Sequence, residues 1–224
     1  MTDDRARSES IREVLGLDGD VRKLDAFYEG WATSYNTDTA AEGYRGPRAL
    51  ADVMEAHVHP AADDRIIDAG CGTGLVGEEL YRRGLRCIDG FDLSRAMVAE
   101  AARLNVYGRL HGGIDLNRPI TEFPAESYDV AVSCGVFTSG HVPPPALMYL
   151  LALVKPGGLC VVSARESYSR ETGFAEYCRE RAREGDLTIV ACHEGHPYTA
   201  HESAQYWVLQ AGLSRLAAVP PAHG

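Results

Sequence analysis

The stretch that most constrains this fold runs from Arg65 to Val76, where a short apolar segment leads into Asp68 and then three alternating glycines. After the glycines, residues 75–82 have the pattern of a helix. Glycine can adopt the unusual backbone angles of a tight strand-to-helix turn, and it lets the backbone approach a ligand closely. We therefore expect a small-molecule cleft at the carboxyl end of the first strand of an α/β sheet.

The glycine turn can be aligned in two registers. A literal G-x-G-x-x-G from Gly72 to Gly77 would indicate a dinucleotide site, in which the strand runs directly into the first glycine. That register places Asp68 and Gly70 inside a buried strand, where an unpaired carboxylate and a glycine are both unfavourable. The register Asp68-x-Gly70-x-Gly72-x-Gly74 leaves the acid at the end of the strand, and we prefer it.

Length and composition favour a single domain without a general affinity for polyanions. The 224 residues fit one domain, which we divide into a helical cap over residues 1–60 and a core over residues 61–215. The net charge of −10 argues against a nucleic-acid binder, whose binding surface would be basic. No run of 18 apolar residues exists and residues 1–5 are mostly charged, so we expect neither a membrane span nor a secretory signal. The six cysteines form no close pairs, which favours reduced thiols in the cytoplasm.

Hydrophobic periodicity predicts a helical cap followed by alternating strands and helices. In the cap, helices are expected over residues 10–17, 20–32 and 47–58, with a break at 33–38. Strands are expected over residues 65–68, 86–92, 109–111, 128–134, 159–164, 187–192 and 206–210, with helices over 77–84, 95–105, 144–154 and 174–184. Ser94 should cap the second of these helices, a turn at 155–158 should precede the fifth strand, and a polar loop at 194–203 should join the last two strands. This alternation predicts an α/β fold with a doubly wound, mostly parallel seven-stranded sheet.

Four features of the chain, taken in order, resemble the class I S-adenosylmethionine-dependent methyltransferases. They are the turn from Asp68 to Gly74, Asp92 at the end of the second strand, Tyr128-Asp129 leading into the fourth, and the turn at 155–158. The resemblance covers roughly residues 25–210. It implies a Rossmann-like methyltransferase fold, S-adenosylmethionine as cofactor, and methyl transfer by in-line displacement.

The same resemblance implies a set of cofactor contacts. The backbone around Gly70 would approach the methionyl part, Asp68 would meet its ammonium directly or through water, and Asp92 would accept both ribose hydroxyls. Leu93 and Met97 could sandwich the adenine, although Met97 could equally belong to the core. The family usually places an acid against the adenine amino group, but Ile114 stands there, so the contact falls to Asp115 or to a backbone group. The full expected set is Tyr35, Asp68, Gly70, Cys71, Gly72, Gly74, Asp92, Leu93, Met97, Ile114, Asp115 and Cys134.

A narrower resemblance involves the cap. The pattern Phe27-Tyr28-x-x-Trp31-Ala32-x-x-Tyr35, with Tyr44-Arg45-x-Pro47 and the later segment 139–143, is similar to a group of methyltransferase-like proteins. That group includes the one encoded in the Williams–Beuren syndrome chromosome region. It implies that Tyr35, with Trp31 and Tyr44 as further candidates, closes over the cofactor. Aromatic residues on such a cap can also be ordinary core.

The acceptor is less well constrained than the donor. No N-P-P-Y-like pattern follows the fourth strand, which disfavours methylation of nucleic-acid amines, so we expect a small-molecule acceptor, with a protein as a second possibility. A general base is needed only if the acceptor must lose a proton. His141 is the preferred candidate because it follows the fourth strand directly, although a loop histidine can simply bond backbone. Other candidates are Tyr35, Glu166 and Tyr168.

Two further sets of residues invite a chemical interpretation that we do not favour. Cys134 could act as a nucleophile, but a buried packing cysteine is the commoner case. The histidines and acids between 193 and 202 match no standard zinc spacing, so we expect no metal site. Two rival functions remain open, a catalytically silent S-adenosylmethionine-binding or scaffold protein and, given the literal glycine match, a dinucleotide oxidoreductase.

Overall fold

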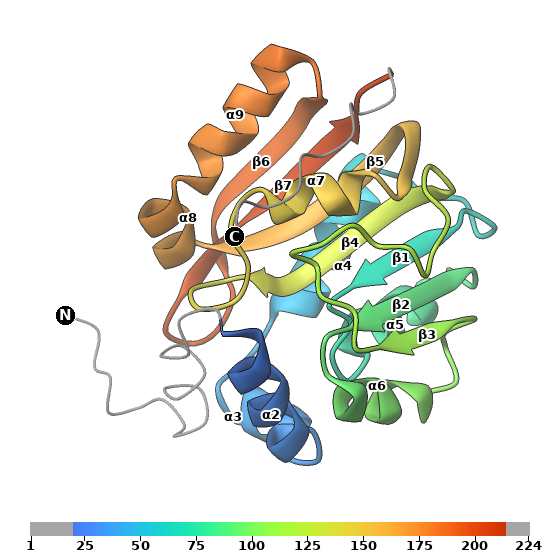
Figure 1. Cartoon of the computed structure of the whole chain (residues 1–224), viewed down its shortest axis with the longest axis vertical. Helices are drawn as coiled ribbons and strands as arrows, with labels where there is room; N and C mark the ends of the chain where they lie inside the picture. The colour runs from blue at the N-terminus through green and yellow to red at the C-terminus, as the bar shows by residue number, and fades with distance from the viewer. Residues whose placement is uncertain (1–19, 214–224) are drawn as a thin grey trace.

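The computed structural model describes residues 20–213, so the helix expected over residues 10–17 lies outside the described residues. Its centre is a seven-stranded sheet with the order β3-β2-β1-β4-β5-β7-β6 (Figure 1). Only β7 runs antiparallel to its neighbours, β5 and β6. The strands are β1 Ile66–Ala69, β2 Ile88–Asp92, β3 Leu110–Gly112, β4 Tyr128–Phe137, β5 Val154–Arg165, β6 Leu187–Pro197 and β7 Ser203–Ala211. The expected doubly wound, mostly parallel sheet is confirmed.

Helices pack on both faces of the sheet, and successive strand residues point to opposite faces. Ile67, Ala131 and Val162 belong to the core shared with α7 Ala146–Leu151, α8 Glu166–Thr172 and α9 Phe174–Glu184. Their chain neighbours Ile66, Val130 and Val161 belong to the core shared with α4 Gly46–His57 and α5 Leu75–Arg82. Strands buried on both faces explain the nearly continuous apolar runs of the sequence.

The cap is built from α2 Val21–Trp31, α3 Tyr35–Ala41 and α4. Figure 1 shows α2 and α3 beside the end of the sheet to which the arrowheads of β1 and β4 point. Leu24 and Trp31 form a small apolar cluster there, against which Phe27, Tyr28, Tyr35 and Leu93 pack. Since Leu93 follows β2, this cluster fixes the cap over the carboxyl ends of the strands. None of the helices in residues 20–213 is long and apolar enough to cross a membrane.

Local sequence signals explain several element boundaries. Asp20 caps α2 by accepting from the backbone amides of Arg22 and Lys23, and Pro47 lies in the first turn of α4. Ser94 caps α6 Arg95–Ala102 by accepting from Met97 N at 3.3 Å, as expected.

Three expectations about the elements are wrong, and one helix was not predicted. The predicted break at 33–38 is mostly α3, because Asp38 ties the segment together by accepting from Trp31 Nε1 at 2.6 Å and Ser34 Oγ at 3.0 Å. The helix α8 was not expected at all. Residues 155–158 are no separate turn, since they lie within β5 where its pairing with β4 is irregular. The polar loop at 194–203 is short, because β6 and β7 continue their antiparallel pairing to Pro197 and Ser203.

Candidate active site

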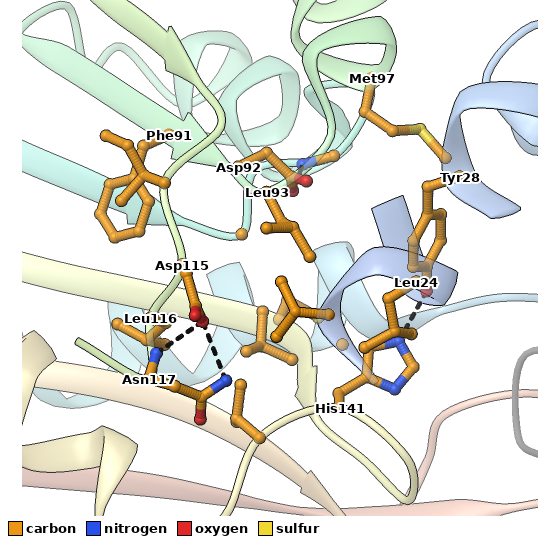
Figure 2. A pocket seen from close by; sticks show the side chains of 18 of the residues that line it. Leu24, Tyr28, Phe91, Asp92, Leu93, Met97, Asp115, Leu116, Asn117 and His141 are labelled. Atoms are coloured by element: carbon orange, nitrogen blue, oxygen red, sulfur yellow. Dashed lines mark hydrogen bonds between the residues drawn. The ribbon is translucent and has the colours of Figure 1, made fainter. Parts of the chain in front are cut away.

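A cavity lies at the carboxyl ends of β1, β2 and β4, under α2 (Figure 2). It has about 780 Å³ of empty space, its open mouth included. In Figure 2, Asp115 and Asn117 lie toward one end of the cavity, and Tyr28 and His141 lie at the other. Most of the expected site residues line it, namely Tyr35, Gly70, Gly72, Asp92, Leu93, Met97, Ile114, Asp115, Cys134 and His141.

The backbone of the glycine turn follows the register Asp68 to Gly74. Gly70, Gly72 and Gly74 have φ values of 69°, 53° and 90°, in the left-handed region that favours glycine. Gly77 instead lies inside α5, where an added Cβ would come within 2.3 Å of the Tyr107 ring. Its missing side chain makes room for that ring, as the third glycine of a dinucleotide turn also would. The strand argues against the dinucleotide register, because β1 ends at Ala69 and does not run directly into Gly72.

Asp92 joins the glycine turn to the end of β2. Its carboxylate accepts from Gly72 N at 2.8 Å and from Ser94 N at 2.9 Å. Burial raises the pKa of this carboxyl, and the backbone amides of Ser94 and Gly72 oppose the rise. A carboxylate offers about four lone-pair positions, so Asp92 can accept from two hydroxyls of a ligand in addition to the two amides.

Asp68 lies deeper than expected. It is part of β1 and fully buried, whereas the sequence suggested a carboxylate at the strand end facing a ligand. Its Oδ2 accepts from the Tyr107 hydroxyl at 2.7 Å, and its Oδ1 has no hydrogen-bond partner within residues 20–213. Burial raises the pKa of Asp68 to about 7. Asp68 therefore does not line the cavity, and the unpartnered oxygen is its remaining capacity to accept.

Two other expected contact residues also lie behind the cavity wall. Cys71 is 5% exposed, and burial raises the pKa of its thiol well above its usual range. Gly74 is the N-cap residue of α5, and an added Cβ there would come within 2.7 Å of Leu104. Both residues shape the turn without reaching the cavity.

The residues after β3 hold one end of the cavity. Asp115 Oδ1 accepts from the backbone and side-chain amides of Asn117, each at 2.9 Å, and its Oδ2 lies 3.2 Å from Arg118 Nε. Asn117 also lines the cavity, and its buried Oδ1 has no partner among the described residues. Asn117, which the sequence reading missed, therefore offers an acceptor that suits an exocyclic amine. The only signal for it was a second polar residue two positions after Asp115.

The opposite end of the cavity is formed by a tyrosine–histidine pair. His141 Nδ1 is 3.1 Å from the Ser139 carbonyl, to which it can only donate, so Nε2 accepts from the Tyr28 hydroxyl at 2.7 Å. Burial lowers the pKa of His141 to about 4, which leaves the ring neutral at neutral pH. Tyr28 comes from α2, and the sequence reading gave it no role of its own. His141 thus donates a hydrogen bond to a backbone carbonyl through one ring nitrogen and accepts one from the cap residue Tyr28 through the other.

The other candidates for acid–base or nucleophilic chemistry have structural partners. Glu166 Oε1 accepts from Gly195 N at 3.1 Å, and the Tyr168 hydroxyl donates to the Val142 carbonyl at 2.9 Å. Burial raises the pKa of Cys134 to about 11, so its thiol stays protonated at neutral pH. In the part of the chain that the structure describes, no group of three His, Cys, Asp or Glu residues could hold a metal ion.

A second cavity of about 480 Å³, open part included, lies against the first. The two share Tyr28, Tyr35, Gly135 and His141 in their walls. The tyrosine–histidine pair therefore stands where the two cavities meet.

The sequence profile of the methyltransferase domain family matches residues 42–214. This chain belongs to that family. S-adenosylmethionine is its cofactor, as expected, and the residues present fit this molecule through the open turn at Gly72, the Asp92 carboxylate and the unpartnered Asn117 oxygen.

Two kinds of relative were found. Human methyltransferase-like protein 27 is 33% identical over 160 residues, which cover 71% of this chain and 64% of that protein. Ubiquinone biosynthesis O-methyltransferase from Stutzerimonas stutzeri is 34% identical over 162 residues, covering 68% and 66%. The chain thus spans about two thirds of the length of these relatives.

Among solved structures, the [4+2]-cyclase SpnF has a TM-score of 0.67 at 16% identity, covering 88% of this chain and 98% of that one. A TehB-like SAM-dependent methyltransferase from Corynebacterium glutamicum has a TM-score of 0.61 at 22% identity, covering 83% and 98%. The solved structures bear on the fold alone.

Proposed function

We propose that this chain transfers the methyl group of S-adenosylmethionine to a small-molecule acceptor. The observation that carries the proposal is the meeting of two cavities at the Tyr28–His141 pair. The larger cavity has the glycine turn and Asp92 of the cofactor site, and the smaller one is open to an acceptor. Two adjoining cavities of limited size favour a small molecule over a protein, and the net charge of −10 disfavours nucleic acid.

Different residues of this chain contact different parts of the cofactor. Asp92 binds the ribose hydroxyls, Asn117 Oδ1 accepts from the adenine amino group, and Leu93 packs against the ring. Gly70 and Gly72 let the backbone approach the methionyl part, and Tyr35 closes the cavity from the cap. The bound cofactor supplies a methyl group on a sulfonium, which an acceptor takes by in-line displacement. The protein then has to position the acceptor and exclude water.

Tyr28 and His141 are the residues that meet the acceptor atom. A neutral His141 can accept a proton at Nε2, which already accepts a hydrogen bond from the Tyr28 hydroxyl, and both residues line both cavities. An acceptor hydroxyl can pass its proton to the Tyr28 oxygen as Tyr28 passes its own to Nε2. The pKa of about 4 makes His141 a weak base, so orientation of the acceptor is its larger contribution.

The alternative is a protein that binds S-adenosylmethionine without turnover. The fold by itself does not define the reaction, so the two-step test below includes this alternative as an outcome. The similarity to human methyltransferase-like protein 27 supports placing this chain in the Williams–Beuren group of methyltransferase-like proteins. A single-domain organisation and a cytoplasmic location complete the proposal, and a protein acceptor is its second choice.

The proposal is tested in two steps. Calorimetric titration should detect binding of S-adenosylmethionine and none of a nicotinamide dinucleotide, and failure to bind the sulfonium cofactor would refute the proposal. The protein is then incubated with cell extract and cofactor carrying a labelled methyl group, and label should appear among small molecules. His141→Gln should slow this transfer, and His111→Gln, a change at an exposed histidine on β3, should not. Cofactor binding without transfer to any fraction would favour the silent binder.

A further inference from the structure

Two residues that line the second cavity each carry a buried polar atom without a partner. Thr138 is 3% exposed, and its hydroxyl oxygen has no hydrogen-bond partner among the described residues. Arg165 is the last residue of β5, and its buried Nε also has no hydrogen-bond partner among the described residues. Both residues line the second cavity and neither lines the first. Because buried polar groups are almost always hydrogen-bonded in folded proteins, two such atoms in one cavity point to a polar group of a ligand.

The missing group is a hydrogen-bond acceptor. The Nε–H of arginine can only donate, and the threonine hydroxyl can donate beside it. Arg165 Nη1 lies 3.2 Å from Glu202 Oε2, and the guanidinium carbon lies 5.0 Å from the centre of the Tyr198 ring. These contacts fix the guanidinium and leave its Nε for a ligand oxygen. A planar oxyanion matches the arginine fork best.

An acidic side chain also lines the cavity and has to be weighed. Glu42 lies with its Oε2 4.0 Å from His201 Nε2, and it has a further partner of its own. An aromatic cavity with a carboxylate could hold a cationic amine. The positive charge of Arg165 opposes that occupant, and its Nε–H can only donate, so a cation cannot satisfy it.

The remaining walls are aromatic. Tyr44 and Tyr198 meet edge to face with ring centres 5.0 Å apart, and Trp31 and Tyr35 do so at 4.7 Å. All four residues line the second cavity. Aromatic walls suit the flat apolar body of a ring.

We propose that the second cavity binds the methyl acceptor, and that this acceptor is a small aromatic carboxylate. Its carboxylate accepts from Arg165 Nε and Thr138 Oγ1, its ring packs among the tyrosines, and its methylated atom lies at the Tyr28–His141 pair. The inference rests on the proposed function, because it takes the adjoining cavity as the cofactor site.

The test uses three probes that differ only at the polar end: 4-hydroxybenzoate, 4-hydroxybenzamide and 4-hydroxybenzylamine. The full chain is first saturated with S-adenosylhomocysteine, and each probe is then titrated by calorimetry. The carboxylate should bind at least about tenfold more tightly than the amide and the amine, because only it carries the negative charge that strengthens the hydrogen bond to the guanidinium. Absence of S-adenosylhomocysteine binding would refute the proposed function itself.

Two variants locate the binding. Thr138→Val keeps the side-chain shape and should weaken 4-hydroxybenzoate binding about fivefold or more. Arg165→Lys keeps a positive charge for Glu202 and should weaken it further, because the planar fork is lost. Thr188→Val, at an exposed threonine on β6, is the matched control and should bind like the parent chain. Thermal melts establish that each variant is folded.

Three results would overturn the acceptor inference while leaving the cofactor site intact. They are no binding of 4-hydroxybenzoate at millimolar concentration, equal or tighter binding of 4-hydroxybenzylamine, and unchanged carboxylate binding by folded Thr138→Val. In each case S-adenosylhomocysteine still binds. Tighter binding of the amine would show that the aromatic cavity binds a cationic ligand instead.

Discussion

Asp92 has two tasks, because the same carboxylate holds the glycine turn and faces the cofactor cavity. Its two oxygens accept from the amides of Gly72 and Ser94. Both amides belong to the segments that shape the cavity. Loss of this carboxylate therefore removes ligand contacts and loosens the turn together.

We predict that Asp92→Ala weakens S-adenosylmethionine binding by about 1–3 kcal/mol, because charge-assisted hydrogen bonds are lost. Asp92→Asn keeps one acceptor oxygen, so its affinity for S-adenosylmethionine should lie between those of the parent chain and Asp92→Ala. Asp52→Ala removes the same charge from an exposed site on α4 and should leave affinity unchanged. Calorimetry measures all three, and full affinity in Asp92→Ala would show that the ribose assignment is wrong.

The buried Asp68 should make the stability of this chain depend on pH. Its pKa is raised by burial from 3.8 to about 7. Below about pH 4 the carboxyl is protonated in both the folded and the unfolded chain, and between about 4 and 7 only the unfolded chain ionises. Its contribution to stability is therefore fully present below about pH 4 and is lost as the pH rises to about 7.

We predict that Asp68→Asn removes this loss. Relative to the variant, the parent chain should lose a free energy of unfolding on the order of a few kcal/mol between about pH 4 and 7. Denaturant unfolding across that range measures the difference. Tyr107→Phe removes a hydrogen bond that lowers the pKa of Asp68, so it should extend the loss to higher pH. Parallel stability curves for parent and Asp68→Asn would contradict the raised pKa.

At the scale of elements, α5 packs closely against the segment that precedes β3. Gly77 is a helix residue whose missing side chain makes room for the Tyr107 ring. The same tyrosine donates to Asp68 in β1. One aromatic residue thus links helix, strand and turn.

We predict that Gly77→Ala destabilises the chain by about 1–3 kcal/mol, because the new methyl group overlaps Tyr107. The matched control is Gly30→Ala in α2, where an added Cβ has nothing within 4 Å. That change should stabilise by about 0.5–1 kcal/mol through helix propensity alone. Urea unfolding compares the two, and a neutral Gly77→Ala would contradict the packing role.

Local patterns predicted most of the core elements, and long-range contacts account for what they missed. Apolar runs located the buried strands, and Ser94 and Pro47 marked their helix starts. The helix α3 depends on Asp38 bonding back to Trp31, which no local propensity shows. The depth of Asp68 depends on Tyr107, 39 positions away, and the His141 partner Tyr28 is 113 positions away. Sequence motifs could therefore suggest the cofactor, while the second cavity needed the fold.

At the scale of the whole molecule, the cap borders both cavities, opposite Gly135 and His141 at the end of β4 and beyond it. Tyr28 from α2 and Tyr35 from α3 lie in the walls of each. Settling these helices against the sheet carries an entropic cost. Whichever ligand binds first lowers that cost for the second.

We therefore predict positive heterotropic cooperativity between cofactor and acceptor. S-adenosylhomocysteine should tighten binding of the acceptor found by methyl labelling by about 5–150-fold, the usual range of coupling between sites. Linkage requires the acceptor to tighten S-adenosylhomocysteine binding by the same factor. Paired titrations with and without the other ligand measure both, and independent affinities would show that the cap is already rigid. A cap shared in this way makes the cell's supply of methyl donor a direct control on how tightly the acceptor is held.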